Sequence, residues 1–178
     1  MVLITVGGPP GSGTSTLCRL LMERTNLRYI YAGQLFRDQA MERGMTLMEF
    51  STLCLEDPSI DRKLDDVMLE EARAGEAILE GRMIGPLCAK NAIASLKVYV
   101  DADPVERARR VMERDGGTLE DVVRTMEMRE DLEKKRYVRY YGIDPTDTSW
   151  YDIVIDSTHH RPEQVLEIVM KKSLNRSC

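Results

Sequence analysis

The stretch GGPPGSGTST, residues 7–16, has glycines and hydroxyl side chains at the spacing of a phosphate-binding loop. Loops of the pattern G-x-x-x-x-G-K-[ST] wrap backbone N–H groups around phosphate oxygens, and the helix that follows presents its positive end to them. Gly8, Gly11 and Gly13 supply the close approach, and the Ser15 hydroxyl is the candidate ligand for Mg²⁺. A glycine-rich turn that only connects a strand to a helix is the alternative. The apolar run VLITV before the loop and the helical pattern after it favour phosphate binding.

Thr14 stands where such loops carry a lysine. A threonine can offer the outer phosphates a hydrogen bond but no positive charge. Charge neutralisation supplies most of the catalysis in phosphoryl transfer. If the loop supports transfer, other cations must therefore replace the lysine.

Two arginines follow successive strands of the expected sheet. AGQLFR places Arg37 one helical turn past Gly33, and ILEGRM places Glu80 and Arg82 where another strand ends. Ligands of open α/β sheets bind at the carboxyl edge of the strands, and a guanidinium matches phosphate oxygens bidentately. We therefore expect a second phosphate site there. Glu80 either pairs with Arg82 or orients the water ligands of a Mg²⁺ ion.

Two further stripes of charge occur in the helical pattern between residues 103 and 142. At helical spacing the stripes carry Arg107, Arg110 and Arg114, then Arg129, Glu133 and Arg136. Like charges at this spacing destabilise a helix unless anions lie between them. The alternative is that the arginines lie on a solvated face. In the second stripe, Glu133 alone could bridge Arg129 and Arg136. We expect these arginines to surround the transferring group. An acceptor that is itself a phosphate needs no general base, because it is ionised at neutral pH.

Short apolar runs alternate with helical patterns along the chain. The runs are residues 2–6, 28–31, 77–79, 96–100 and 152–155. This alternation predicts an α/β fold, a three-layer arrangement with a five-stranded parallel sheet and helices on both faces. Helices are expected to about Thr25, from Gly33 to Gly44, over 45–56 and 57–75, over 103–142 with a break at DGG, and from Pro162. The helical stretches after the second and fourth strands are candidate flaps over a substrate.

The composition sets limits on the protein class. A chain of 178 residues holds one domain, which we place at 1–178, and its net charge of −5 argues against nucleic acid as a partner. The cysteines form no Cys-x-x-Cys pair, which favours core thiols in a reduced, cytoplasmic protein. No signal peptide or membrane span is expected. We expect a monomer whose partners are small-molecule nucleotides.

The loop, AGQLFR, EGR and the arginine helices together resemble the nucleoside monophosphate kinases, and within them the archaeal-type cytidylate kinases. Those proteins tolerate a GTxT loop and end in a YGID…S-x-YD-x-VID run. The run YYGIDPTDTSWYDIVIDST from Tyr140 to Thr158 matches it. The resemblance covers nearly the whole chain, and its terminal run is the specific part.

The resemblance implies transfer of the ATP γ-phosphate to CMP or dCMP with Mg²⁺, in pyrimidine nucleotide metabolism. It implies a core sheet, a monophosphate-binding flap at about 33–75 and a short arginine-bearing lid at about 110–135. It assigns Arg37 and Arg82, with Gly33 and Gly81 beside them, to CMP, Arg110 or Arg114 to ATP, and Glu133 to the cytosine amino group. The residues assigned to the ATP phosphates are Gly8, Pro9, Pro10, Gly11, Ser12, Gly13, Thr14, Ser15 and Thr16.

Two departures from the bacterial relatives concern the base. Met83 follows Gly-Arg where they have Asp, and they carry a longer flap insertion. An adenylate kinase is the nearest rival, but EGRMIGPL lacks its Phe-Pro-Arg and the glutamine soon after. Two more rivals are a regulator that binds ATP without catalysis and a kinase of a non-nucleotide metabolite.

Overall fold

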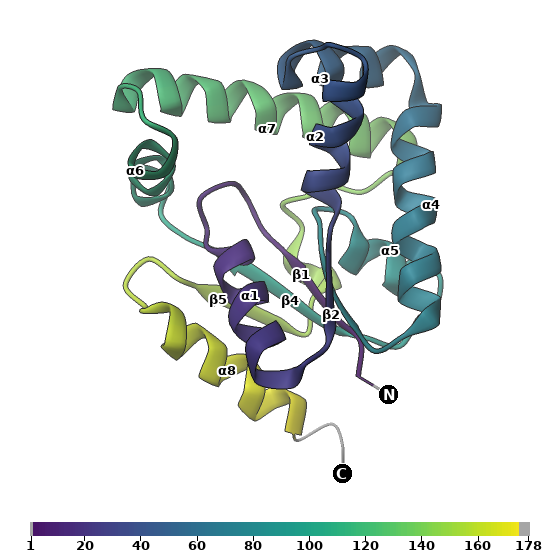
Figure 1. Ribbon diagram of the computed structural model, residues 1–178, viewed down its shortest axis with the longest axis vertical. Coiled ribbons are helices and arrows are strands. Elements are labelled where there is room, and N and C mark those ends of the chain that lie inside the picture. Colours follow the sequence, from purple (N-terminus) through teal and green to yellow (C-terminus); the bar gives the residue numbers. More distant parts are fainter. Residues whose placement is uncertain (1, 175–178) are drawn as a thin grey trace.

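The computed structural model describes residues 2–174, which build a five-stranded parallel sheet (Figure 1). The strands run in the order β2-β3-β1-β4-β5. Their bounds are β1 Ile4–Gly7, β2 Arg28–Tyr31, β3 Ala77–Glu80, β4 Leu96–Asp101 and β5 Ile153–Asp156. The chain leaves β1 toward β2 on one side and later crosses to β4 on the other. The carboxyl end of β1 is therefore a topological switch point, where open α/β sheets bind ligands.

Helices cover both faces of the sheet. On one face α1 (Thr14–Thr25) packs beside α8 (Pro162–Leu174) over a core that includes Val6, Leu17 and Val98. On the other face α4 (Pro58–Ala74) and α5 (Ile84–Lys90) enclose Leu79 and Met68. The central strands are buried on both faces, which is why they read as continuous apolar runs.

Three helices between β2 and β3 form a side body with its own small core. They are α2 (Ala32–Glu42), α3 (Leu47–Glu56) and α4. Thr46 and Glu49 form a capping box at the start of α3, and the Asp57 side chain caps α4. Phe50 and Cys54 are fully buried between these helices. The expected flap region is thus helical throughout, and β3 begins three residues after α4 ends.

Two helices between β4 and β5 frame the carboxyl edge of the sheet. Helix α6 (Pro104–Asp115) is capped by Asp103, and α7 (Leu119–Tyr141) begins after the cap residue Thr118 and ends at Gly142, whose φ is +62°. Figure 1 shows α7 running above that edge from α6 to α3. Residues on α7 can therefore contact both the glycine loop and the side body.

The predicted fold class is confirmed, including the five parallel strands and helices on both faces. Helix α5 and the short 3₁₀ helix η1 (Thr148–Trp150) were not predicted. Gly85 and Pro86 look like helix breakers, but they occupy the first turn of α5, where a proline loses no helical hydrogen bond.

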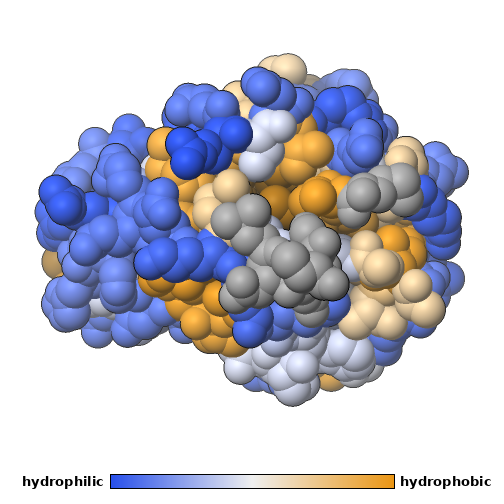
Figure 2. Space-filling view, turned by 90° about the horizontal axis from the view of Figure 1, so that it is seen from below, coloured by the Kyte–Doolittle hydropathy of each residue, from blue (hydrophilic) through white to orange (hydrophobic). Residues whose placement is uncertain are grey.

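Figure 2 views the molecule from below, on the side away from α7, and shows hydrophobic surface near the middle of that face with hydrophilic surface around it. No helix among residues 2–174 is long and apolar enough to cross a membrane. Cys18, Cys54 and Cys88 are buried free thiols, as expected, and Cys178 lies outside the described residues.

Candidate active site

The loop between β1 and α1 has the backbone of a phosphate cradle. Gly11 and Gly13 have φ values of +78° and +97°, which side chains rarely adopt. A Cβ on Gly11 would lie 2.4 Å from the Arg107 carbonyl oxygen, and a Cβ on Gly8 would lie 2.1 Å from that of Val100. Helix α1 begins at Thr14, so its free N–H groups open onto the loop.

Ser15 and Glu80 meet at the start of α1. The Ser15 hydroxyl donates to Glu80 Oε1 at 2.7 Å, and the Tyr29 hydroxyl donates to Glu80 Oε2. Burial raises the pKa of Tyr29 well above its ordinary value, and Glu80 raises it further, so Tyr29 stays a donor. Of the two alternatives for Glu80, the pairing with Arg82 is not made, because Arg82 pairs with Glu133 and Glu80 accepts from Ser15, the candidate Mg²⁺ ligand.

A cavity of about 510 Å³ lies between the glycine loop, β3, the side body and α7. Five arginines and five carboxylates line it, together with Tyr31 and Tyr137. The arginines are Arg37, Arg82, Arg114, Arg129 and Arg136, and the carboxylates are Asp61, Asp65, Glu80, Asp115 and Glu133. The cavity also contains Gly33, Gly81, Thr14 and Ser15. The structure thus brings together most of the site residues expected from the sequence.

Arg82 connects three parts of the cavity. Its Nε donates to Glu133 Oε2 on α7 at 2.5 Å, and its Nη1 donates to the Gly8 carbonyl oxygen. Glu133 Oε1 also accepts from Arg129 Nε at 2.9 Å. Burial alone would raise the pKa of Glu133, but the positive charges of Arg82 and Arg129 outweigh it and hold the pKa below its ordinary value. Glu133 therefore stays ionised and holds two arginines at the cavity.

Glu133 does not bridge Arg129 and Arg136, the alternative that their helical spacing left open. Arg136 Nη1 donates to both oxygens of Asp61 on α4, at 3.0 and 3.1 Å, and Glu133 takes Arg82 as its second partner. Arg136 and Asp61 are 1% and 3% exposed. The partner differs because Asp61 on α4 lies next to Arg136, which the helical spacing within α7 does not reveal. Asp61 was missed as a site residue.

Asp65 is a second carboxylate that the sequence reasoning missed. It follows Asp61 by one helical turn, and its Oδ2 accepts from the Tyr141 hydroxyl at 2.5 Å. Burial raises the pKa of Asp65 to about 7; the bond from Tyr141 and the charge of Arg136 act against this, and the charge of Asp61 adds to it. A carboxylate in this cavity therefore titrates near neutral pH.

The raised pKa of Asp65 should make the free energy of unfolding depend on pH. Between about pH 4 and pH 7 the folded state binds more protons than the unfolded state, so the free energy of unfolding falls as the pH rises through that window. Asp65→Asn removes this loss. We expect the difference in free energy of unfolding, variant minus wild type, to increase by about 1–3 kcal/mol from pH 5 to pH 8. Urea unfolding without ligand at the two pH values measures it. The exposed Glu70→Gln on the same helix is the control, and an equal difference at both pH values would contradict this account of Asp65.

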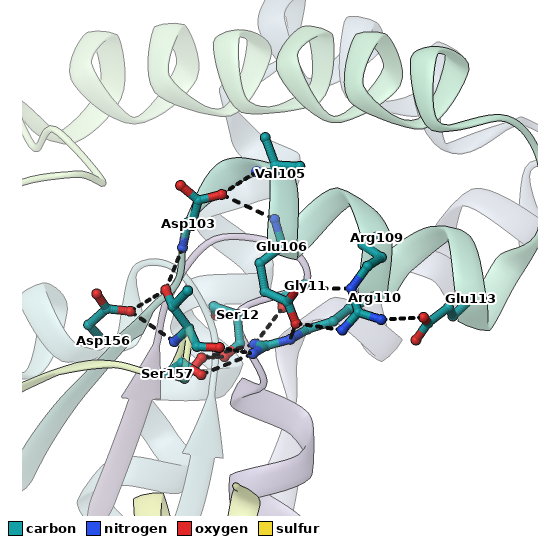
Figure 3. Close-up of polar contacts among 11 residues, drawn as sticks. Gly11, Ser12, Asp103, Val105, Glu106, Arg109, Arg110, Glu113, Asp156 and Ser157 are labelled. Atoms are coloured by element: carbon teal, nitrogen blue, oxygen red, sulfur yellow. Dashed lines mark hydrogen bonds and ion pairs between the residues drawn. The ribbon is translucent and has the colours of Figure 1, made fainter. Parts of the chain in front are cut away.

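Arg110 lies at the base of the expected lid (Figure 3). It donates to Ser157 Oγ at 3.0 Å, to the Ser157 carbonyl oxygen at 2.9 Å and to the Gly11 carbonyl oxygen at 3.4 Å, and it pairs with Glu106. Ser157 Oγ in turn donates to the Ser12 carbonyl oxygen at 2.7 Å. Arg110 thereby joins α6, the glycine loop and the segment after β5.

A second cavity, of about 170 Å³, opens beside this contact. Gly13, Thr16, Arg110 and His160 are among its lining residues. It shares no lining residue with the larger cavity within the described chain, and the larger cavity contains Arg114 instead of Arg110. The resemblance assigned either Arg110 or Arg114 to ATP. The structure places these two arginines in different cavities.

Arg107, in the same stripe as Arg110 and Arg114, is 8% exposed. Its Nη1 donates to the Pro10 carbonyl oxygen at 3.2 Å and to Glu130 Oε1 on α7 at 2.6 Å. The solvated-face alternative therefore fails for this position, although Arg114 pairs with Asp115 near the surface. Arg107 supports the glycine loop and ties it to α7.

The sheet order, the glycine loop that opens α1 and the arginine-lined cavity define the P-loop kinase class. Solved structures agree on the fold: shikimate kinase from Acinetobacter baumannii superposes with a TM-score of 0.63 at 14% identity, over 99% of this chain and 94% of that one. A family model described as the cytidylate kinase-like family matches residues 3–159. The chain belongs to that family.

Curated relatives named cytidylate kinase match nearly the whole chain. The protein from Methanopyrus kandleri is 41% identical over 175 residues, covering 94% of this chain and 91% of its own. The one from Pyrococcus furiosus is 44% identical over 168 residues, covering 94% and 86%. The resemblance recognised in the sequence is confirmed.

Proposed function

We propose that the protein transfers the γ-phosphate of ATP to CMP or dCMP, with Mg²⁺, giving CDP or dCDP. The observation that carries this is one cavity with two phosphate-binding elements: the glycine loop on one side, and Arg37 and Arg82 on the other. Both arginines follow strands adjacent in the sheet. Family membership and the names of the relatives support the choice of CMP.

The loop residues Gly8 to Thr16 fit the phosphates of ATP, because Gly11 and Gly13 adopt positive φ and the N–H groups of α1 open onto the loop. Ser15 and Glu80 fit Mg²⁺, a hard cation that takes oxygen ligands and keeps several waters: Ser15 would be a ligand, and Glu80 would orient a water ligand. When bound, Mg²⁺ neutralises charge on the phosphate oxygens. Arg110 holds the adenine end of ATP in the smaller cavity, which Thr16 also lines.

On the acceptor side, the guanidinium groups of Arg37 and Arg82 bind the CMP phosphate. Arg37 lies over the Tyr31 ring, 5.0 Å from its centroid, which fixes its direction. Gly33 allows this, because a Cβ there would lie 2.5 Å from the Tyr31 ring. Glu133 accepts the cytosine amino group. An acceptor phosphate needs no general base.

The arginines of α7 replace the lysine that Thr14 lacks. Arg129 and Arg136 surround the transferring group, Arg114 reaches the outer phosphates, and all of them line the larger cavity with Thr14. Phosphate oxygens must compete with Glu133, Asp61 and Asp115 for these guanidinium groups. The protein carboxylates thus keep the arginines in place before substrates arrive.

Arg129 gives the first test of this arrangement. We expect Arg129→Ala to lower kcat on the order of tenfold or more, because it removes a charge-stabilising group. Thr14→Lys should leave the Kd of CMP intact. Arg124→Ala, an exposed position on the same helix, is the control for steady-state turnover. Unchanged turnover in Arg129→Ala would remove that residue from the mechanism.

Residues 33–75 would act as the flap over CMP and residues 110–135 as the lid over the phosphates, in a monomer of the cytoplasm. The second of these segments comprises the end of α6, the turn at Gly116 and much of α7. Closure of α7 toward the glycine loop would exclude water from the transferring phosphate. Arg107 and its bond to Glu130 link the loop to α7 at that point.

ADP formation with single acceptors separates the rival functions. ATP and Mg²⁺ are offered with CMP, dCMP, UMP, AMP or GMP, beside a control without acceptor. We expect activity with CMP and dCMP. Activity with AMP alone would identify an adenylate kinase, and ATP binding without ADP formation in any mixture would identify a regulator.

A further inference from the structure

Tyr29 lies on the edge strand β2 and reaches across to β3. It is in register with Ile78, and Glu80 is two residues further along β3, so all three side chains lie on the same face of the sheet. That face is the one covered by α1, where Tyr29 packs against the core. The Tyr29 hydroxyl donates to Glu80 Oε2.

The two oxygens of Glu80 are held by two different elements. Oε2 accepts from Tyr29 on β2, and Oε1 accepts from Ser15 on α1 at 2.7 Å. Glu80 is 4% exposed, so few other orientations are open to it. Rotation of the carboxylate would break one bond or the other. Because the Ser15 hydrogen is committed to Glu80, the lone pairs of the Ser15 oxygen remain for a cation.

We propose that Tyr29 is a positioning residue for the Mg²⁺ site. Its hydroxyl fixes the Glu80 carboxylate, which orients the Ser15 hydroxyl and the water ligands of Mg²⁺ that arrives with the nucleotide. Groups of this kind, one bond removed from the metal ligands, control metal affinity in many sites. The inference rests on the proposed function, because it takes a Mg²⁺–nucleotide complex as the phosphate donor.

The direct test is the effect of Mg²⁺ on ADP affinity. Calorimetry gives the Kd of ADP in EDTA and in Mg²⁺ for wild type and for Tyr29→Phe, which keeps the ring and removes only the hydroxyl. We expect the Kd in EDTA to be unchanged and the gain from Mg²⁺ to be smaller on the order of tenfold. In kinetics, kcat should fall while the KM for CMP stays constant. If the Tyr29 hydroxyl only contributed to packing, its removal would change neither the effect of Mg²⁺ on ADP affinity nor kcat at constant KM.

A double-mutant cycle shows whether Tyr29 acts through Glu80. In the Glu80→Gln background, Tyr29→Phe should cause no further loss of the Mg²⁺ response. Tyr140→Phe is the matched control: its hydroxyl donates to the Cys54 and Leu55 carbonyl oxygens in the side body, so the Mg²⁺ response should not change.

Two results would overturn the inference: a Mg²⁺ response in Tyr29→Phe equal to that of wild type, or a loss that is undiminished in the Glu80→Gln background. Failure of the proposed function looks different. In that case the wild type would bind ADP with Mg²⁺ but phosphorylate no nucleoside monophosphate, and the binding measurements would still decide the role of Tyr29.

Discussion

Arg82→Ala is expected to lower kcat/KM for CMP by about 10²–10³-fold, the cost of removing one preorganised donor from a site of developing charge. The variant loses the cation at the end of β3 and leaves Glu133 paired with Arg129 alone. It also frees the Gly8 carbonyl oxygen in the glycine loop. Steady-state kinetics with CMP varied at saturating ATP measures the effect.

Two further variants sharpen this expectation. Arg82→Lys keeps the charge but not the planar fork, so it should recover only part of the activity. Arg28→Ala removes an arginine from the opposite end of the sheet, where it pairs with Glu71 at the surface, and should leave kcat/KM unchanged. A loss below tenfold in Arg82→Ala would show that the acceptor phosphate binds elsewhere.

Asp61→Ala is expected to destabilise the protein by about 3–5 kcal/mol, since it leaves the buried Arg136 guanidinium without its carboxylate. Urea unfolding of the ligand-free protein at pH 7 gives the free energy of unfolding. The matched control is Asp131→Ala, which breaks an exposed pair with Lys135 and should cost less than about 1 kcal/mol. Equal losses in the two variants would mean that the Asp61–Arg136 pair is solvated.

The strands and most helices could be predicted because their signals are local. Buried parallel strands give continuous apolar runs. Gly11 and Gly13 mark a loop whose positive φ angles favour glycine. Helix α5 was missed because Pro86 normally ends a helix, while here it occupies the first turn. Its position in the turn depends on where β3 ends, which the sequence alone does not show.

The cavity was predicted in outline, but its pairings were not. Arg37, Arg82 and Glu80 line one cavity, as expected, because strand ends meet at one edge of the sheet. The partner of Arg136 lies on α4 and that of Glu133 follows β3, so both pairings depend on contacts between elements far apart in sequence. A signal for Asp61 and Asp65 did exist. Both precede buried residues of α4 at helical spacing, where a solvated acid would be out of place.

In the proposed reaction, a phosphate-binding loop without its lysine transfers a phosphoryl group to cytidine monophosphate. The most direct measurement follows the label from ATP labelled in the γ-phosphate, incubated with Mg²⁺, CMP and the protein. The account predicts that the label appears in CDP, one equivalent for each ADP formed. Label in inorganic phosphate alone, or ATP that stays intact while bound, would contradict it.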